Sequence, residues 1–170
     1  MNEHKGMRPQ DVAILLKIVA LGDRSWTGAE VARALHLSAA EVSNSLKRSA
    51  LAGLIDGSRR RVSRGALLEF LKHGLPYVFP VRPGGVVRGV PTAHAAPPLR
   101  VKFAGADAYV WPYAKGQAQG QALAPLYAGA AAAALEDPAL YELLALADAL
   151  RVGRARERSE AEKELAKRLK

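Results

Sequence analysis

The chain has 170 residues, a net charge of +9 and 49% hydrophobic residues, which predicts a folded protein with a sizeable core rather than a disordered one. The absence of cysteine excludes a disulfide framework, a thiol nucleophile and Cys-ligated metal sites. No apolar run approaches the roughly 18–20 residues that cross a bilayer, and residues 1–6 lack the apolar stretch of a secretory signal, so we expect a cytoplasmic protein with no membrane partner.

The positive charge is concentrated in the first half of the chain. Residues 1–75 carry 12 Lys and Arg against 7 Asp and Glu, whereas residues 137–170 carry 8 against 7. A basic excess favours a polyanionic partner, and a near-neutral segment that is dense in both signs is typical of a solvated helix. A polyanion site is therefore expected within residues 1–75, although charge alone does not choose among DNA, RNA and a membrane surface.

Three helices are predicted in the first fifty residues. Residues 8–21 have a broad apolar face, with Pro9 in the first turn where its missing amide costs nothing. Thr27-Gly28-Ala29-Glu30 and Ser38-Ala39-Ala40-Glu41 both have the spacing of a capping box, which opens a helix. Two short helices that meet at a tight turn are typical of a helix-turn-helix.

A short hairpin with a basic tip is predicted directly after these helices. Leu54-Ile55 and Arg59-Arg60-Arg61-Val62 are predicted strands around a turn signal, Asp56-Gly57-Ser58. Alternation along the second strand points the middle arginine, Arg60, away from the side that its two neighbours share. A hairpin in this position is a wing.

Helix caps, tight turn, second helix, glycine stop and basic wing follow one another in order between residues 8 and 74. This order resembles the winged helix-turn-helix transcriptional regulators of the MarR-like kind. The residues that carry the resemblance are Trp26–Leu35, Leu37-Ser38, Glu41-Val42-Ser43, Leu46-Lys47-Arg48 and Ala52–Ile55. The resemblance implies a winged-helix domain and a regulator that binds double-stranded DNA.

The second helix of the pair is the predicted recognition helix. Small residues at its start permit close approach to the major groove, and Asn44 is suited to bidentate recognition of adenine. Lys47 and Arg48 are expected to contact phosphates, and the wing arginines to clamp phosphates or enter a minor groove. The predicted DNA-binding residues are Ser38, Ala39, Ala40, Ser43, Asn44, Lys47, Arg48, Arg59, Arg60 and Arg61.

Proline and glycine break the chain into short extended pieces after Leu75. Within residues 76–136, alternation over Leu99–Phe103 predicts a half-buried strand, Tyr109–Trp111 predicts another, and residues 114–124 are a predicted loop. Residues 137–170 are predicted to form a C-terminal helix that begins at Asp137-Pro138, with the apolar stripe Leu140, Leu143, Leu144, Ala147 and Leu150.

The predicted fold is mainly α with a small β component. It consists of a winged helix-turn-helix over residues 1–75, a Pro/Gly-rich segment with short strands over 76–136, and the helix over 137–170. The apolar stripe of this helix must be buried, either on its own domain or across a two-fold interface. We expect the C-terminal helix to help form a homodimer, because a dimer gains specificity by contacting two half-sites.

The leading functional prediction is a sequence-specific DNA-binding regulator, acting as a dimeric repressor. The alternative is a partner-binding module, such as an antitoxin or the accessory subunit of a two-component toxin or defence system. Residues 76–170 would then hold the partner while the winged helix autoregulates. An RNA-binding factor is a third, weaker interpretation.

No enzyme, cofactor or metal site is predicted. The four histidines stand alone, without the spacing of a metal site, and neither a nucleophile elbow nor a phosphate-binding glycine loop occurs. These histidines are His4, His36, His73 and His94.

Overall fold

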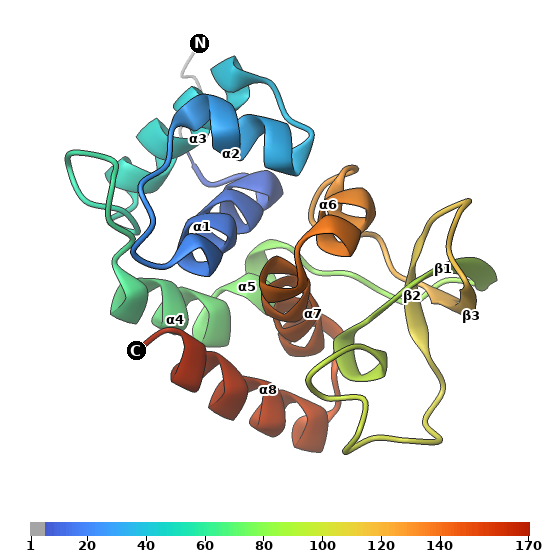
Figure 1. Ribbon diagram of the computed structural model, residues 1–170. Coiled ribbons are helices and arrows are strands. Elements are labelled where there is room, and N and C mark those ends of the chain that lie inside the picture. Colours follow the sequence, from blue (N-terminus) through green and yellow to red (C-terminus); the bar gives the residue numbers. More distant parts are fainter. Residues whose placement is uncertain (1–5) are drawn as a thin grey trace, which may run out of the picture.

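A computed structural model describes residues 6–170 (Figure 1), so the isolated His4 lies outside the described residues. The elements are α1 (Pro9–Leu21), α2 (Gly28–Leu35), α3 (Ala39–Leu51), α4 (Arg64–His73), α5 (Leu75–Val78), β1 (Val86–Thr92), the 3₁₀ turn η1 (Ala93–Ala95), β2 (Tyr109–Pro112), β3 (Ala118–Ala122), α6 (Ala130–Glu136), α7 (Pro138–Val152) and α8 (Ala155–Arg168). The prediction of a mainly α fold with a small β component is confirmed.

The first three helices begin and end close to where local sequence signals predict. Thr27 Oγ1 accepts from the Glu30 amide at 3.1 Å, and Glu30 accepts from the Thr27 amide at 2.7 Å, which completes the capping box of α2. Ser38 Oγ accepts from the Glu41 amide at 3.0 Å at the start of α3. The carboxylate of Glu41 is bonded to other side chains instead, as described below.

The predicted two-stranded hairpin after α3 forms only one β-bridge. A single bridge, Ile55 to Val62, joins the two sides of residues 54–62, here called the 54–62 loop. Ile55 is buried and Val62 is partly buried against the core, so this pair anchors the loop while its tip stays exposed. The helix predicted after Ser63 is α4.

The β component closes on itself. β1 pairs antiparallel with both β2 and β3, and β2 pairs parallel with β3. Glycine makes this closure possible, because a Cβ at Gly89 would lie 1.9 Å from the Trp111 carbonyl oxygen and one at Gly120 would lie 2.6 Å from that of Ala108. The strand at Tyr109–Trp111 is confirmed as β2.

One strand prediction and one loop prediction in this region are wrong. Residues 99–103 form turns rather than a strand, since Leu99 is fully buried while Val101 is 78% exposed and neither pairs with a neighbouring strand. The predicted loop at 114–124 contains β3, whose Gln, Gly and Ala residues include no large apolar or β-branched side chain. Both errors arise because strand pairing depends on distant partners rather than on local sequence.

The predicted C-terminal helix is two helices. The chain bends at Gly153 and Arg154, and α8 folds back along α7 (Figure 1). The Arg154 amide donates to Glu157 at 2.6 Å, which caps the new helix. A Cβ on Gly153 would lie 2.3 Å from the Ala149 carbonyl oxygen, so glycine is required at this bend.

The α7 stripe predicted to form a dimer interface is buried within the chain. Helix α7 packs against α1, α5, α6 and α8, and against β1 and η1. Of the two alternatives for this stripe, burial within its own chain is the one that the structure shows, so the stripe is not available as a dimer interface. Its residues, Leu140, Leu143, Leu144, Ala147 and Leu150, are 0–3% exposed.

One apolar core runs through the whole fold, from Val12 in α1 to Leu169 after α8. Both predicted boundaries, at 75/76 and 136/137, fall within it. Lys17 of α1 donates to Asp137 at 2.6 Å, and the other oxygen of Asp137 accepts from the Leu140 amide at 3.1 Å to cap α7. The N-terminal helices are therefore tied directly to the C-terminal half.

The Lys17–Asp137 pair predicts a specific pH dependence of stability. Burial alone would raise the pKa of Asp137, but the hydrogen bond from Lys17, the α7 amides and the Lys17 charge outweigh burial and lower it. A carboxyl with a lowered pKa stabilises the fold above its unfolded value near 4, and this stabilisation is lost as pH falls through the folded pKa.

Replacing Asp137 by Asn keeps an N-cap side chain and removes only the charge. We expect Asp137→Asn to lower the free energy of unfolding by about 1 kcal/mol at pH 7 and to flatten its decline below pH 4. Urea unfolding across pH measures both effects, with the exposed Asp107→Asn as the matched control. An Asp137→Asn curve parallel to that of the wild type would contradict the assignment.

Candidate nucleic-acid interface

One face of α3 is polar and exposed, as predicted. The opposite face packs into the core through Val42 and Leu46, and also buries Ser45 and Ser49. Small side chains occupy the first turn of the exposed face, and an amide and an ammonium group follow them. The exposed residues of this face, with the N-cap, are Ser38, Ala39, Ala40, Ser43, Asn44 and Lys47.

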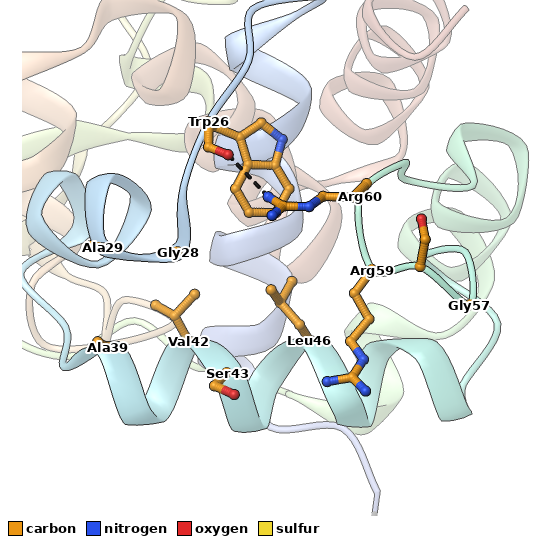
Figure 2. A pocket seen from close by; sticks show the side chains of 11 residues that line it. Trp26, Gly28, Ala29, Ala39, Val42, Ser43, Leu46, Gly57, Arg59 and Arg60 are labelled. Carbon is orange, nitrogen blue, oxygen red and sulfur yellow. Dashed lines mark hydrogen bonds between the residues drawn. The ribbon is translucent and has the colours of Figure 1, made fainter.

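An open pocket of about 360 Å³ lies between α3, the start of α2 and the 54–62 loop (Figure 2). Val42 and Leu46 point into it from α3, Trp26 lies across from them, and Arg59 extends over α3 from the loop. Ser43 points away from Val42, toward the exposed side of α3. None of the residues that line this pocket is acidic.

Asp56 shapes the tip of the 54–62 loop. Its carboxylate accepts hydrogen bonds from Ser58 Oγ at 2.7 Å and from the amides of Arg61 and Arg60 at 3.0 and 2.8 Å. These donors lower the pKa of Asp56 to about 2 by favouring its ionised form. Arg59 lies between Ser58 and Arg60 in the chain and adopts a left-handed φ of 60°.

The three wing arginines diverge. Arg60 folds back, donating from Nη1 to the Trp26 carbonyl oxygen at 3.0 Å with its guanidinium 4.9 Å from the indole ring centre. Arg59 lines the pocket beside α3, whereas Arg61 lines a different pocket. The prediction that Arg59 and Arg61 share one side is wrong, because the left-handed residue interrupts the alternation of a strand.

Arg48 is not a phosphate contact. It donates two hydrogen bonds to the fully buried Asp11, at 2.9 and 2.7 Å, and a third to Glu41. The bonds to Asp11 and then to Glu41 raise the pKa of Arg48, and its side chain is only 12% exposed. The predicted role is wrong because position 48 turns from the exposed face of α3 toward α1.

The position of Asp11 in the sequence indicates that this carboxylate needs a partner such as Arg48. Asp11 stands at the start of the apolar run of α1, where an unpaired carboxylate would be costly to bury. Gln10 of the same helix turn bonds Glu41 at 3.2 Å, so α1 and α3 are joined by a polar cluster of Gln10, Asp11, Glu41 and Arg48.

Two arginines that sequence analysis missed lie close to the 54–62 loop. Arg24, between α1 and α2, and Arg64, at the start of α4, line a second open pocket together with Arg60 and Arg61. They are forty residues apart, and only the tertiary fold brings them together.

His94 is the one buried histidine among residues 6–170. His94 is buried between Phe103 and Tyr109, with Nε2 2.7 Å from the Asp107 carbonyl oxygen. Across residues 6–170, His, Asp and Glu side chains do not gather in threes as a metal ion would need. No helix in that range is both long and apolar enough to cross a membrane.

No family model, curated protein or solved structure matches this chain. The function proposed below therefore depends on its residues and geometry alone.

Proposed function

We propose that this protein is a sequence-specific transcriptional regulator that binds double-stranded DNA, with α2 and α3 as a helix-turn-helix and the 54–62 loop as its wing. The observation that carries the proposal is the exposed edge of α3, where Ala39 and Ser43 line an open pocket together with Arg59 and no acidic residue. An α-helix fits the major groove, and an arginine beside it reaches the flanking backbone or minor groove. We expect such a regulator to act in the cytoplasm.

The roles of the α3 residues follow from their chemistry. Ala39 and Ala40 let the start of the helix approach the base edges closely, and Asn44 supplies a donor and an acceptor for adenine. Lys47, one turn further along α3, supplies a charge for a phosphate.

Base specificity tests the role of Asn44. Selection from a random duplex pool is expected to yield a defined site, and Asn44→Ala should lose about 1–3 kcal/mol of discrimination at one position of each half-site. Binding to unselected duplexes should change little. Quantitative mobility shifts with single-base variants of the selected duplex measure this, and Lys115→Ala, in the β2–β3 connection at the other end of the molecule from α3 (Figure 1), is the control. Equal discrimination by Asn44→Ala and wild type would remove Asn44 from the interface.

A repressor dimer is part of the proposal, but it needs a surface other than the α7 stripe. Two copies on a two-fold site would place their recognition helices about one DNA turn, 34–36 Å, apart. Light scattering of the free protein and of its complex with the selected duplex decides the stoichiometry. One protomer on each duplex would contradict the dimer.

A protein partner is the second candidate. Five of the six large apolar side chains that the structure exposes lie within residues 76–136, namely Tyr77, Val78, Val86, Val101 and Leu135. If these exposed side chains of residues 76–136 hold a partner, Val86→Ser and Leu135→Ser should lose that partner while DNA affinity is unchanged. If these two variants lose DNA affinity and nothing else, the protein-partner candidate is contradicted.

A further inference from the structure

A second pocket lies on the other side of the wing from α3. It has a volume of about 690 Å³ and is lined by the α1–α2 connection, including Asp23 and Arg24, and by Arg61 and Arg64 across from it. Trp26 and Arg60 line both this pocket and the one beside α3. The stacked Trp26–Arg60 pair is therefore the wall that the two pockets share, and we call the second one the arginine pocket.

The arginine pocket has a large unbalanced positive charge. Four arginines line it against one carboxylate, Asp23. Within residues 6–170, none of these four arginines lies within 4.0 Å of an Asp or Glu side-chain carboxylate. Arg48, Arg151 and Arg168, by contrast, are each paired with a carboxylate.

The guanidinium groups of the arginine pocket also keep most of their donors free. Arg24 donates to the Leu21 carbonyl oxygen at 3.2 Å, Arg60 to that of Trp26, and Arg64 to that of Lys170 at 3.2 Å. Each guanidinium has five N–H donors arranged in a fork that matches the oxygens of a phosphate. Like charges at this density repel, and a bound anion relieves that repulsion.

We propose that the arginine pocket binds phosphate groups and that, in the protein–DNA complex, it holds backbone phosphates flanking the groove that α3 enters. This inference rests on the proposed function. The two pockets share the Trp26–Arg60 wall, so a duplex seated on α3 continues past the wing toward Arg24 and Arg64. These contacts carry affinity without sequence preference, because every nucleotide presents the same phosphate.

The test uses the full chain with Arg24→Gln and Arg64→Gln combined, and Arg82→Gln with Arg88→Gln as a control of equal charge on exposed residues near the strands. We expect the pocket variant to bind the selected duplex at least tenfold more weakly at near-physiological salt. The slope of log affinity against log salt should fall by about 1.8, because each lost phosphate contact accounts for about 0.9. Base preference should be unchanged, and the control should match the wild type.

Arg24→Gln alone, which leaves the Arg64 contact with the chain end intact, guards against misfolding of the double variant; its slope should fall by about 0.9. If the wild type binds the selected duplex and neither variant changes affinity or slope, the inference is overturned and the proposed function stands.

A titration with inorganic pyrophosphate separates the two sources of phosphate. The arginine Nε–Hε signals of the wild type should shift saturably, and those shifts should vanish in the double variant. If the wild type binds no duplex but shows this response, the proposed function fails and the pocket is a site for a free phosphate compound. No saturable response together with no duplex binding overturns both.

Discussion

Replacing Arg48 by methionine is expected to lower the free energy of unfolding by about 3–5 kcal/mol, because it leaves the carboxylate of Asp11 buried without its cation. Asp11 is fully buried and receives two of the three hydrogen bonds that Arg48 donates. Methionine keeps most of the volume of the side chain, so the loss reports the charge rather than a cavity. Urea unfolding at pH 7 gives the value.

Lys47→Met is the matched control, since position 47 is exposed and adjacent; we expect it to change stability by less than about 0.5 kcal/mol. Asp11→Leu combined with Arg48→Met should recover part of the loss, because replacing both members of a buried pair by apolar groups is often neutral. If Arg48→Met folds as stably as the wild type and loses only DNA affinity, Arg48 is a phosphate contact after all.

Asp148→Ala is expected to cost a similar amount, about 3–5 kcal/mol. Asp148 is buried in α7, where Oδ2 accepts from Thr92 Oγ1 and Trp111 Nε1, both at 2.7 Å, and Oδ1 accepts from Arg151 at 2.9 Å. Removing the carboxylate leaves two buried donors and one buried cation unpaired. The site joins β1 and β2 to α7, so the closed sheet should loosen first.

Unfolding followed by tryptophan fluorescence is suited to this variant, because Trp111 is one of only two tryptophans in the chain. Asp107→Ala, at an exposed carboxylate, is the control. A loss below about 1 kcal/mol in Asp148→Ala would mean that water replaces the carboxylate at little cost.

The N-terminal helices are predictable because their signals are local. The capping residues Thr27 and Ser38 fix the starts of α2 and α3, and the apolar spacing of α1 places its buried face. The exposed residues of α3 follow from the same periodicity. The orientation of the Arg48 side chain cannot be predicted from this periodicity, because Arg48 lies at the edge of that face. Its direction depends on the contact with Asp11, which is distant in sequence.

The C-terminal half is predictable only in part. Asp137 and Pro138 predict the start of α7. The closed sheet of β1, β2 and β3 depends instead on contacts between segments far apart in sequence, such as Val87 with Gly120. The charge pattern after Gly153 suits a helix whether or not the chain bends there, so it did not reveal the separate α8. The arginine pocket could not be predicted either, because Arg24 and Arg64 come from different elements.

Salt-dependent DNA binding tests the central claim, that the exposed face of α3 and the 54–62 loop bind duplex DNA, most directly. The affinity of the wild type and of Lys47→Ala combined with Arg59→Gln for the selected duplex would be measured by fluorescence anisotropy from about 50 to 300 mM KCl. The account predicts at least tenfold weaker binding by the variant at near-physiological salt, a salt slope lower by about 1.8 and an unchanged melting temperature. Equal affinities and slopes for variant and wild type, or no saturable duplex binding by the wild type, would contradict it.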